Sequence, residues 1–119
     1  MTGHLKEYAF PLYDAEPRFL KACLREAEDG VSTPEIHSQL SDHDVTEEDL
    51  EVLAAFLKGM RTHISRRGLR TTYVLINACI YGLGAFEFQT LTGFSVADAL
   101  NLNLRIAKTL YGCYDSARF

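Results

Sequence analysis

Residues Thr71–Phe86, with the sequence TTYVLINACIYGLGAF, form the most apolar stretch of this 119-residue chain. A helix that crosses a membrane needs about 20 apolar residues, whereas the run from Tyr73 to Phe86 is 14 residues long and contains Asn77. Its β-branched residues also suit a buried strand. However, the apolar pattern continues without a turn signal from Thr71 to Leu91, well beyond the usual strand length of about 5 to 6 residues. We therefore predict a helix over residues 71–91 and no membrane anchor.

This predicted helix is apolar around most of its circumference. At about 100° per residue, it has a broad apolar side, a side of small residues and a narrow polar stripe. The broad side contains Leu75, Ile76, Cys79, Ile80, Leu83 and Phe86, the small-residue side Ala78, Gly82 and Ala85, and the stripe Arg70, Tyr73, Asn77 and Tyr81. Such a helix must be covered on several sides. We expect it at the centre of a bundle, with a second chain covering one side.

Three further helices are predicted before this one. Asp14 and Pro17 suit the start of a helix over residues 15–29, and Ser32–Glu35 resembles a capping box before a short helix at 34–40. Thr46 suits the N-cap of a longer helix that ends at Arg67. Acidic residues gather at its start and basic residues at its end, as the helix macrodipole favours. Its apolar seam is Leu50, Leu53, Leu57, Met60 and Ile64.

The last predicted helix follows the capping residue Ser95 and runs to Tyr111, where Gly112 can close it. Asn103 falls inside its apolar arc. A buried amide needs a hydrogen-bond partner, so we expect Asn103 to bind Asn77 or a backbone carbonyl, or to set the register of a helix pair. In the tail 113–119, Phe119 either folds back onto the core or joins Tyr111 and Tyr114 as an exposed anchor.

Composition predicts a single all-α domain over residues 1–119, with an N-terminal arm at 1–14 and a C-terminal tail at 113–119. We expect a small bundle of about four long helices and one short helix, assembled as a homodimer. Sixteen acidic and twelve basic residues give a net charge of −4, which disfavours coating of phosphate backbones. The N-terminus resembles neither a signal nor a transit peptide, so we expect a cytoplasmic protein. The widely spaced Cys23, Cys79 and Cys113 are expected to be reduced core thiols.

No catalytic, cofactor or metal signature stands out. His37 and His43 lie near Asp42 and Asp44, but their spacing matches no established ligand pattern, and whether they converge stays open. No glycine-rich phosphate loop is present, and no cysteine has a histidine nearby in sequence. We predict a non-enzymatic protein without a cofactor or a bound metal.

Two alternatives stay open. Residues 34–40 and the helix from Glu47 have the layout of a helix-turn-helix, although acidic residues occupy the start of the second helix, where DNA contacts are expected. The basic cluster contains Lys58, Arg61, Arg66, Arg67 and Arg70, and it keeps a DNA-binding regulator in consideration. A phage or plasmid inhibitor or an immunity protein has a similar build.

Taken whole, the chain resembles the small helical antiactivators that Gram-negative bacteria use against LuxR-type quorum-sensing regulators. The chain length, the Thr46–Arg67 and Tyr73–Phe86 segments and the aromatic end at Phe119 carry this resemblance. It implies a homodimer that binds the ligand-binding domain of a LuxR-type receptor and so blocks receptor dimerisation and DNA binding.

The faces of the predicted helices indicate the candidate site residues. The predicted partner or dimer interface contains Tyr73, Asn77, Ile80, Tyr81, Phe86, Asn103, Leu104, Tyr111, Tyr114 and Phe119, and Arg66, Arg67 and Arg70 are expected to steer acidic partners. We expect a protein partner, with no direct contact to nucleic acid or membrane.

Overall fold

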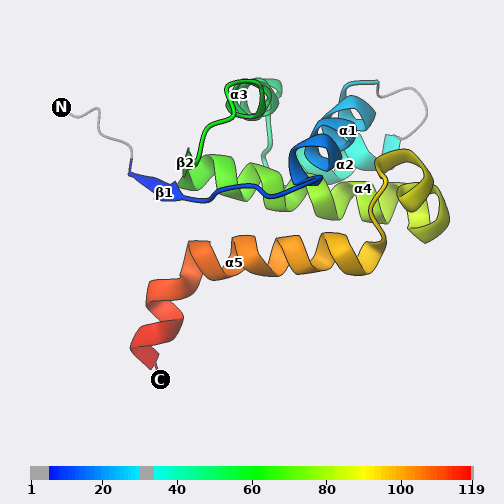
Figure 1. Ribbon diagram of the computed structural model, residues 1–119. Helices are drawn as coiled ribbons and strands as arrows, with labels where there is room; N and C mark the ends of the chain where they lie inside the picture. The colour runs from blue at the N-terminus through cyan, green and yellow to red at the C-terminus, as the bar shows by residue number, and fades with distance from the viewer. Residues whose placement is uncertain (1–5, 30–33, 119) are drawn as a thin grey trace.

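The computed structural model describes the backbone of residues 6–29 and 34–118 and the side chains of residues 6–28 and 34–111. Five helices and a small two-stranded sheet make up this part of the chain (Figure 1). The order is β1 (Glu7–Ala9), α1 (Glu16–Asp29), α2 (Pro34–Asp42), α3 (Glu47–Lys58), β2 (His63–Ser65), α4 (Arg66–Thr92) and α5 (Val96–Arg118). The fold is thus mostly helical, as predicted.

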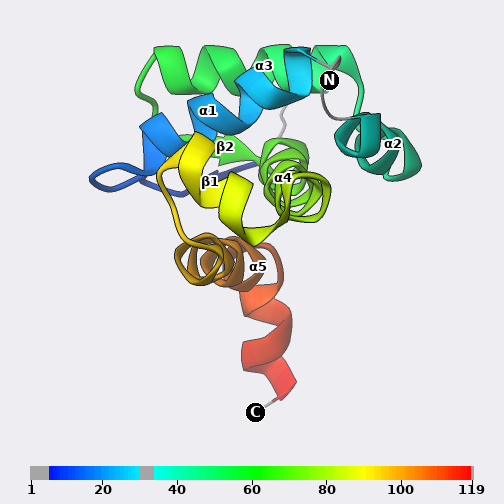
Figure 2. The same ribbon diagram turned by 90° about the vertical axis from the view of Figure 1, so that its right-hand side faces the viewer.

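Helix α4 is the centre of the molecule. It contacts each of the other four helices, with α1, α2 and α3 on one side and α5 on the other (Figure 1 and Figure 2). On length and composition, α4 is also the one described helix that could cross a membrane. Its contacts place it inside the bundle, as expected for a helix that is apolar nearly all round.

The predicted helix 71–91 is a helix and not a strand, but it is longer and interrupted. It begins at Arg66, where the Ser65 hydroxyl accepts a hydrogen bond from the Gly68 N–H, and it ends at Gly93, which has φ 81°. Gly84 has φ 78° and ψ 161°, a conformation outside the helical region that is essentially restricted to glycine. The expectation of one continuous helix is therefore wrong, because Gly84 divides α4 into two segments.

The predicted helix from Thr46 to Arg67 is also wrong at its C-terminal end. Its start is confirmed: Thr46 and Asp49 form a reciprocal capping box. The helix then ends at Lys58, and Met60 adopts φ 50°, which does not continue a right-handed helix. Met60 is 86% exposed, and Ile64, the last residue of the predicted seam, lies in β2.

A two-stranded antiparallel sheet was not predicted. Tyr8 of β1 pairs with Ile64 of β2, and the flanking pairs are Glu7 with Ser65 and Ala9 with His63. Part of the predicted N-terminal arm is therefore a strand. This pairing joins segments far apart in sequence and ends just before Arg66, so the sheet sets where α4 begins.

Helix α5 covers the side of α4 opposite the first three helices. It begins after Ser95, whose hydroxyl accepts a hydrogen bond from the Asp98 N–H at 3.1 Å. Contrary to prediction, Gly112 does not end it: the helix continues to Arg118. Its C-terminal turns project away from the other helices (Figure 1 and Figure 2). The side chains of the predicted tail, including Tyr114 and Phe119, lie outside the described residues.

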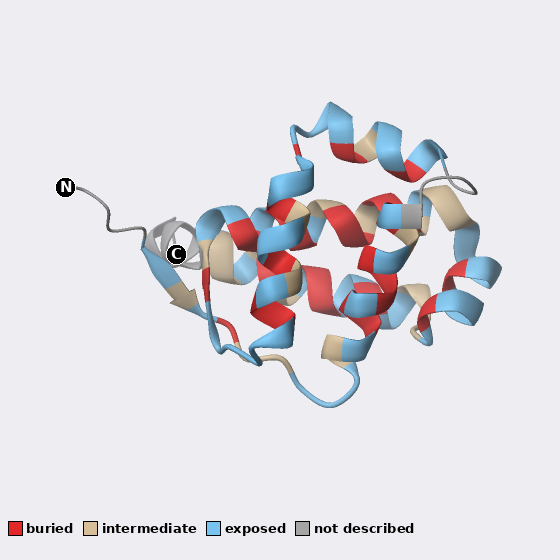
Figure 3. Ribbon diagram, turned by 90° about the horizontal axis from the view of Figure 1, so that it is seen from above, coloured by how far each residue is buried: buried red, intermediate tan, exposed pale blue. Residues whose placement is uncertain are grey.

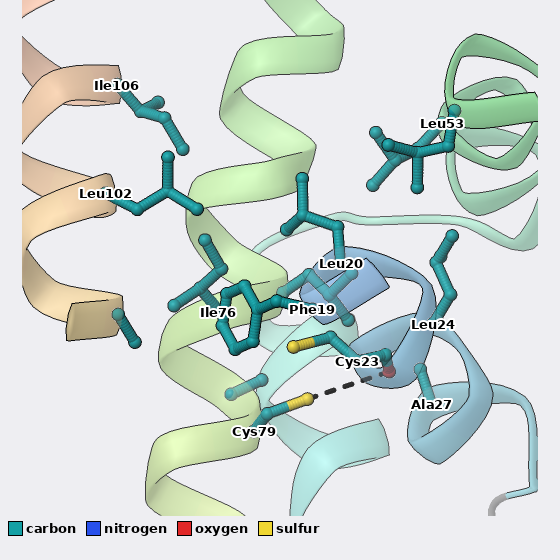
Figure 4. Packing of buried hydrophobic residues seen from close by; sticks show 14 of the residues in the cluster. Phe19, Leu20, Cys23, Leu24, Ala27, Leu53, Ile76, Cys79, Leu102 and Ile106 are labelled. Carbon is teal, nitrogen blue, oxygen red and sulfur yellow. Dashed lines mark hydrogen bonds between the residues drawn. The ribbon is translucent and has the colours of Figure 1, made fainter. Parts of the chain in front are cut away.

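The core forms where the helices face α4, and the residues facing solvent are mostly exposed (Figure 3). Figure 4 shows Ile76 of α4 between Leu102 and Ile106 of α5 and Phe19 of α1. Cys23 and Cys79 are free and buried, as predicted. The Cys79 thiol donates to the Cys23 carbonyl at 3.7 Å, and burial raises the pKa of the Cys23 thiol. Both thiols therefore fill space in the core.

Candidate protein-interaction surface

The outer side of α5 carries a row of apolar residues that the other described residues leave uncovered. Leu100, Leu104 and Tyr111 are 50%, 55% and 49% exposed. Together with Ala97 and Ala107, they recur at alternating spacings of three and four residues. This is the spacing by which one helix packs lengthwise against another. We call Ala97, Leu100, Leu104, Ala107 and Tyr111 the α5 seam.

The opposite sides of α5 are fastened to the chain itself. Asn103 and Ile106 are buried against α4. On a second flank, the Arg105 guanidinium donates to both carboxylate oxygens of Glu16 at 2.7 and 2.8 Å. Burial disfavours the charged form of Glu16, but the bonds from Arg105 and from the Tyr13 N–H outweigh it and lower the Glu16 pKa. The α5 seam is thus the side of the helix that intramolecular packing leaves free.

A stripe of α4 lies beside the α5 seam. Tyr73, Asn77 and Tyr81 are spaced four residues apart and share one side of α4. Tyr81 is 70% exposed, and Tyr73 is also exposed. A cleft of about 270 Å³ lies between the two helices and contains Tyr73 and Asn77 from α4 and Ala107 and Tyr111 from α5. We call this cleft, together with the stripe and the seam, the α4–α5 face.

The size of the cleft limits what it can hold. Sites for cofactors and drug-sized ligands are about 300–1,000 Å³, so a cleft of 270 Å³ suits one large side chain of a partner. Its walls are partly apolar, from Val74 and Leu110, and partly polar, from Gln39, His43 and Arg70. Such a mixture of apolar and polar lining suits an anchor pocket in a protein interface.

The amide of Asn103 joins α4 and α5 where the two helices pack against each other. Its Nδ2 donates to the Tyr73 carbonyl at 3.2 Å and to Asn77 Oδ1 at 3.0 Å, and Asn103 is only 3% exposed. The pairing of Asn103 with Asn77 and with a backbone carbonyl is confirmed. Asn103 therefore fixes the register of α4 against α5 within one chain. Because it is buried, Asn103 has little exposed surface for a partner.

The remaining predicted interface residues are scattered. Leu104 and Tyr111 belong to the α5 seam, whereas Ile80 is partly buried against the core. Phe86 was expected on the broad apolar side of α4, but it is 85% exposed. It lies beyond Gly84, where the change in backbone direction moves it off that side. Sequence reasoning did not select Ala97, Leu100 and Ala107, although their spacing with Leu104 and Tyr111 could have revealed them.

The three arginines expected to steer partners have intramolecular contacts. Arg67 binds both carboxylate oxygens of Asp49, at 2.5 and 2.9 Å. The Arg66 guanidinium donates to the Leu110 carbonyl at 3.3 Å and lies 5.6 Å from the centre of the Tyr111 ring. Arg70 donates to the His43 carbonyl at 2.6 Å. Arg66, Arg67 and Arg70 lie at the start of α4 and not at the end of α3. The expectation that they stabilise a helix C-terminus through the macrodipole is therefore wrong.

The two histidines considered for a metal site line different hollows. His37 faces a cavity between α1, α2 and α3, whereas His43 belongs to the α4–α5 cleft. Among the described side chains, no group of three or more His, Cys, Asp or Glu residues is placed to hold a metal ion.

Comparison with known proteins adds no relative: no protein-family model, no curated protein and no solved structure matches this chain.

Proposed function

We propose that the chain is a non-enzymatic regulatory protein that binds other protein chains through the α4–α5 face. The observation that carries the proposal is the α5 seam, whose residues have helix-packing spacing and whose large side chains Leu100, Leu104 and Tyr111 are exposed. Apolar area that stays in contact with water contributes no hydrophobic stabilisation. Burial of this row against another chain is therefore favourable. A partner helix would bury it.

The first partner we propose is a second copy of the chain. Two α5 helices can bury their seams against each other around a twofold axis, the commonest symmetry of small assemblies. Complete burial of a large apolar side chain contributes about 1.5–3 kcal/mol. Since Leu100, Leu104 and Tyr111 are already half-buried, the six of them in a dimer contribute roughly 5–9 kcal/mol, near the lower end of the association cost of about 4–15 kcal/mol. A tight dimer therefore also uses Tyr73 and Tyr81 of the α4 stripe.

The electrostatics of the described residues support binding over catalysis. The clear pKa shifts belong to the ion pairs Glu16–Arg105 and Asp49–Arg67 and to the core thiol Cys23. None of these groups is in the α4–α5 cleft. Asp49 and Arg67 line a separate pocket beside β1, but each owes its pKa shift mainly to the other, as in a structural ion pair.

As the regulatory target, we propose a LuxR-type quorum-sensing receptor in the cytoplasm. The resemblance described above motivates this choice: the chain would cover the receptor's ligand-binding domain and prevent receptor dimerisation and DNA binding. The helix-turn-helix alternative is weaker, since the first turn of α3 contains Glu47, Glu48 and Asp49. Phosphates repel these side chains, and carboxylates cannot donate hydrogen bonds to guanine.

Co-purification tests the target. Ligand-binding domains of LuxR-type receptors, loaded with their signal molecules, are mixed with the chain and passed over a sizing column. We expect a complex with the wild type and none with Leu104→Asp, which places a charge in the middle of the α5 seam. Met60→Asp is the matched control, because Met60 is 86% exposed, lies outside the α4–α5 face and adopts a left-handed conformation that Asp tolerates. Equal binding by Leu104→Asp and Met60→Asp would contradict the proposed surface.

A further inference from the structure

The start of α4 has an unfavourable charge distribution. Arg66, Arg67 and Arg70 lie within the first turns of this helix, and no acidic residue accompanies them there. A helix N-terminus carries about half a positive charge and is stabilised by acidic residues. Three cations at this end therefore lower the stability of the helix. Features that break a local rule of stability tend to occur where a protein has a functional site.

The contacts within the chain compensate only part of this charge. Two ion pairs form among the described side chains, and of the three arginines only Arg67 takes part, with Asp49. Arg66 and Arg70 donate to backbone carbonyls, which accept a hydrogen bond but do not neutralise a cation. Each of these two guanidiniums retains further N–H donors. Among the described side chains, these two positive charges thus have no anionic partner.

These cations surround a pocket of about 770 Å³ between β1, α3 and the start of α4. Lys6 contributes a fourth positive charge, while Tyr8 and Val52 supply apolar wall. Val52 is 55% exposed, so its side chain is free for contact. A pocket of this volume falls within the range of ligand sites, about 300–1,000 Å³.

We propose that this basic pocket binds an acidic segment of a partner protein. Carboxylates of the segment bind the free guanidinium edges of Arg66 and Arg70, and an apolar side chain between them packs on Val52 and Tyr8. Arginine suits this role because its planar donor group matches a carboxylate in two hydrogen bonds at once. The recognised chemistry is a short peptide with two or more Asp or Glu residues around one apolar residue.

The acidic groups near the pocket favour a peptide over a nucleic acid. Asp44 and Asp49 line the same pocket, and the chain has a net charge of −4. A nucleic acid presents closely spaced phosphates over a long surface, so it would meet these carboxylates as well as the arginines. A short peptide needs to meet only the basic edge of the pocket.

The basic pocket adjoins the α4–α5 cleft. Arg70 lines both hollows, and Arg66 reaches Leu110 and Tyr111 beside the cleft. A partner anchored in the cleft can therefore place an acidic segment in the pocket. This inference rests on the proposed function and deepens it, because it specifies the charge and chemistry of the partner.

The test uses a fluorescent peptide, acetyl-Asp-Glu-Leu-Glu-Asp-amide, and fluorescence anisotropy. We expect the wild-type protein to bind it, with an affinity that weakens as salt rises. The double variant Arg66→Glu and Arg70→Glu should bind at least about tenfold more weakly. These changes place acidic residues at a helix N-terminus, which stabilises the helix, so the variant is expected to fold. Arg25→Glu, an exposed site on α1, is the matched control.

Three results would overturn the inference: no binding by the wild type, equal binding by the double variant, or tighter binding of a short DNA duplex than of the peptide. Light scattering on the same samples separates this inference from the proposed function. If the protein is a dimer but does not bind the peptide, the result contradicts the proposed basic pocket and leaves the proposed dimer standing. A monomer that binds the peptide, with binding lost in the double variant, supports the pocket and contradicts the proposed dimer.

Discussion

At the scale of single residues, the carboxylate of Asp49 joins two parts of the fold. It accepts the Thr46 backbone N–H at 2.9 Å and binds the guanidinium of Arg67. The hydrogen bonds from Arg67 lower the Asp49 pKa most, and those from Thr46 lower it further against the opposing effect of burial. Asp49 thereby connects the start of α3 to the start of α4.

This contact makes stability depend on pH in a defined direction. Because the folded-state pKa of Asp49 is lowered, its contribution is complete above the unfolded-state value of about 3.9 and is lost as pH falls through the folded-state pKa. We expect Asp49→Asn to reduce the free energy of unfolding by about 1 kcal/mol at pH 7 through the weakened cap. The difference from wild type should shrink in acid, as the pH falls from about 3.9 toward the lowered folded-state pKa of Asp49.

Urea unfolding at pH 7 and at about pH 3 measures this difference. Asp42→Asn removes an exposed carboxylate at the end of α2 and serves as the control. A loss for Asp49→Asn that stays constant down to the lower pH would contradict the assigned role.

Asn103 supports a second prediction, because its amide is the donor in the bond with Asn77. Asn103→Asp removes that donor and buries a carboxylate beside two oxygen acceptors. We expect a loss of about 2 kcal/mol or more at pH 7, with partial recovery in acid, where a protonated Asp can donate. Asn77→Asp keeps an acceptor facing Asn103, so it should cost less. Thermal or urea unfolding of the two variants measures this order, and the reverse order would show that the amides are paired the other way round.

At the scale of elements, the division of α4 depends on Gly84. Its φ of 78° and ψ of 161° lie in a region essentially closed to other residues. Gly93 has φ 81° and ψ −4°, a left-handed conformation that Asn tolerates. We expect Gly84→Asn to reduce the free energy of unfolding by about 1–3 kcal/mol and Gly93→Asn to reduce it less.

Chemical denaturation of both variants provides the measurement. A substituted side chain at either position has open space around it, so backbone conformation and not steric overlap would cause the difference. Equal effects would indicate that Gly84 does not need its unusual conformation.

The elements show where sequence reasoning succeeds and where it does not. The start of α3 follows from a local capping box, and the apolar length of Thr71–Leu91 correctly favours a helix. The boundary between α3 and α4 does not follow, because continuous helical spacing conceals the left-handed Met60. Ile64 fits the apolar seam of a helix, yet it pairs with Tyr8. This strand pairing is a long-range contact that no local pattern specifies.

The candidate surface could be predicted only in part, for related reasons. Leu104 and Tyr111 could be selected because the apolar arc of their helix is wider than one packed side needs, and Tyr73 because it lies on the polar stripe of its helix. The burial of Ile80 and the displacement of Phe86 depend on which neighbours cover α4 and on the break at Gly84. A role for Arg66 and Arg70 in attracting acidic partners was expected from the sequence, but their position at a helix N-terminus was not. The same residues at a helix C-terminus would be stabilising.

At the scale of the whole molecule, α5 is an outer layer with one side left uncovered. In the view of Figure 2, α1 and α3 lie above α4, α2 lies beside it and α5 lies below it. No other described segment packs on the α5 seam, as the exposure of Leu100, Leu104 and Tyr111 shows. We therefore propose that this side of the molecule forms contacts between chains.

Light scattering coupled to size-exclusion chromatography tests this central claim most directly. At micromolar concentration we expect twice the chain mass of 13.4 kDa, unchanged between low and high salt because an apolar interface is little affected by screening. Leu104→Asp should elute at the mass of a single chain, and Met60→Asp should keep the wild-type mass. A wild-type protein that stays at 13.4 kDa over the whole concentration range would contradict the proposal that the α5 seam joins two copies of the chain.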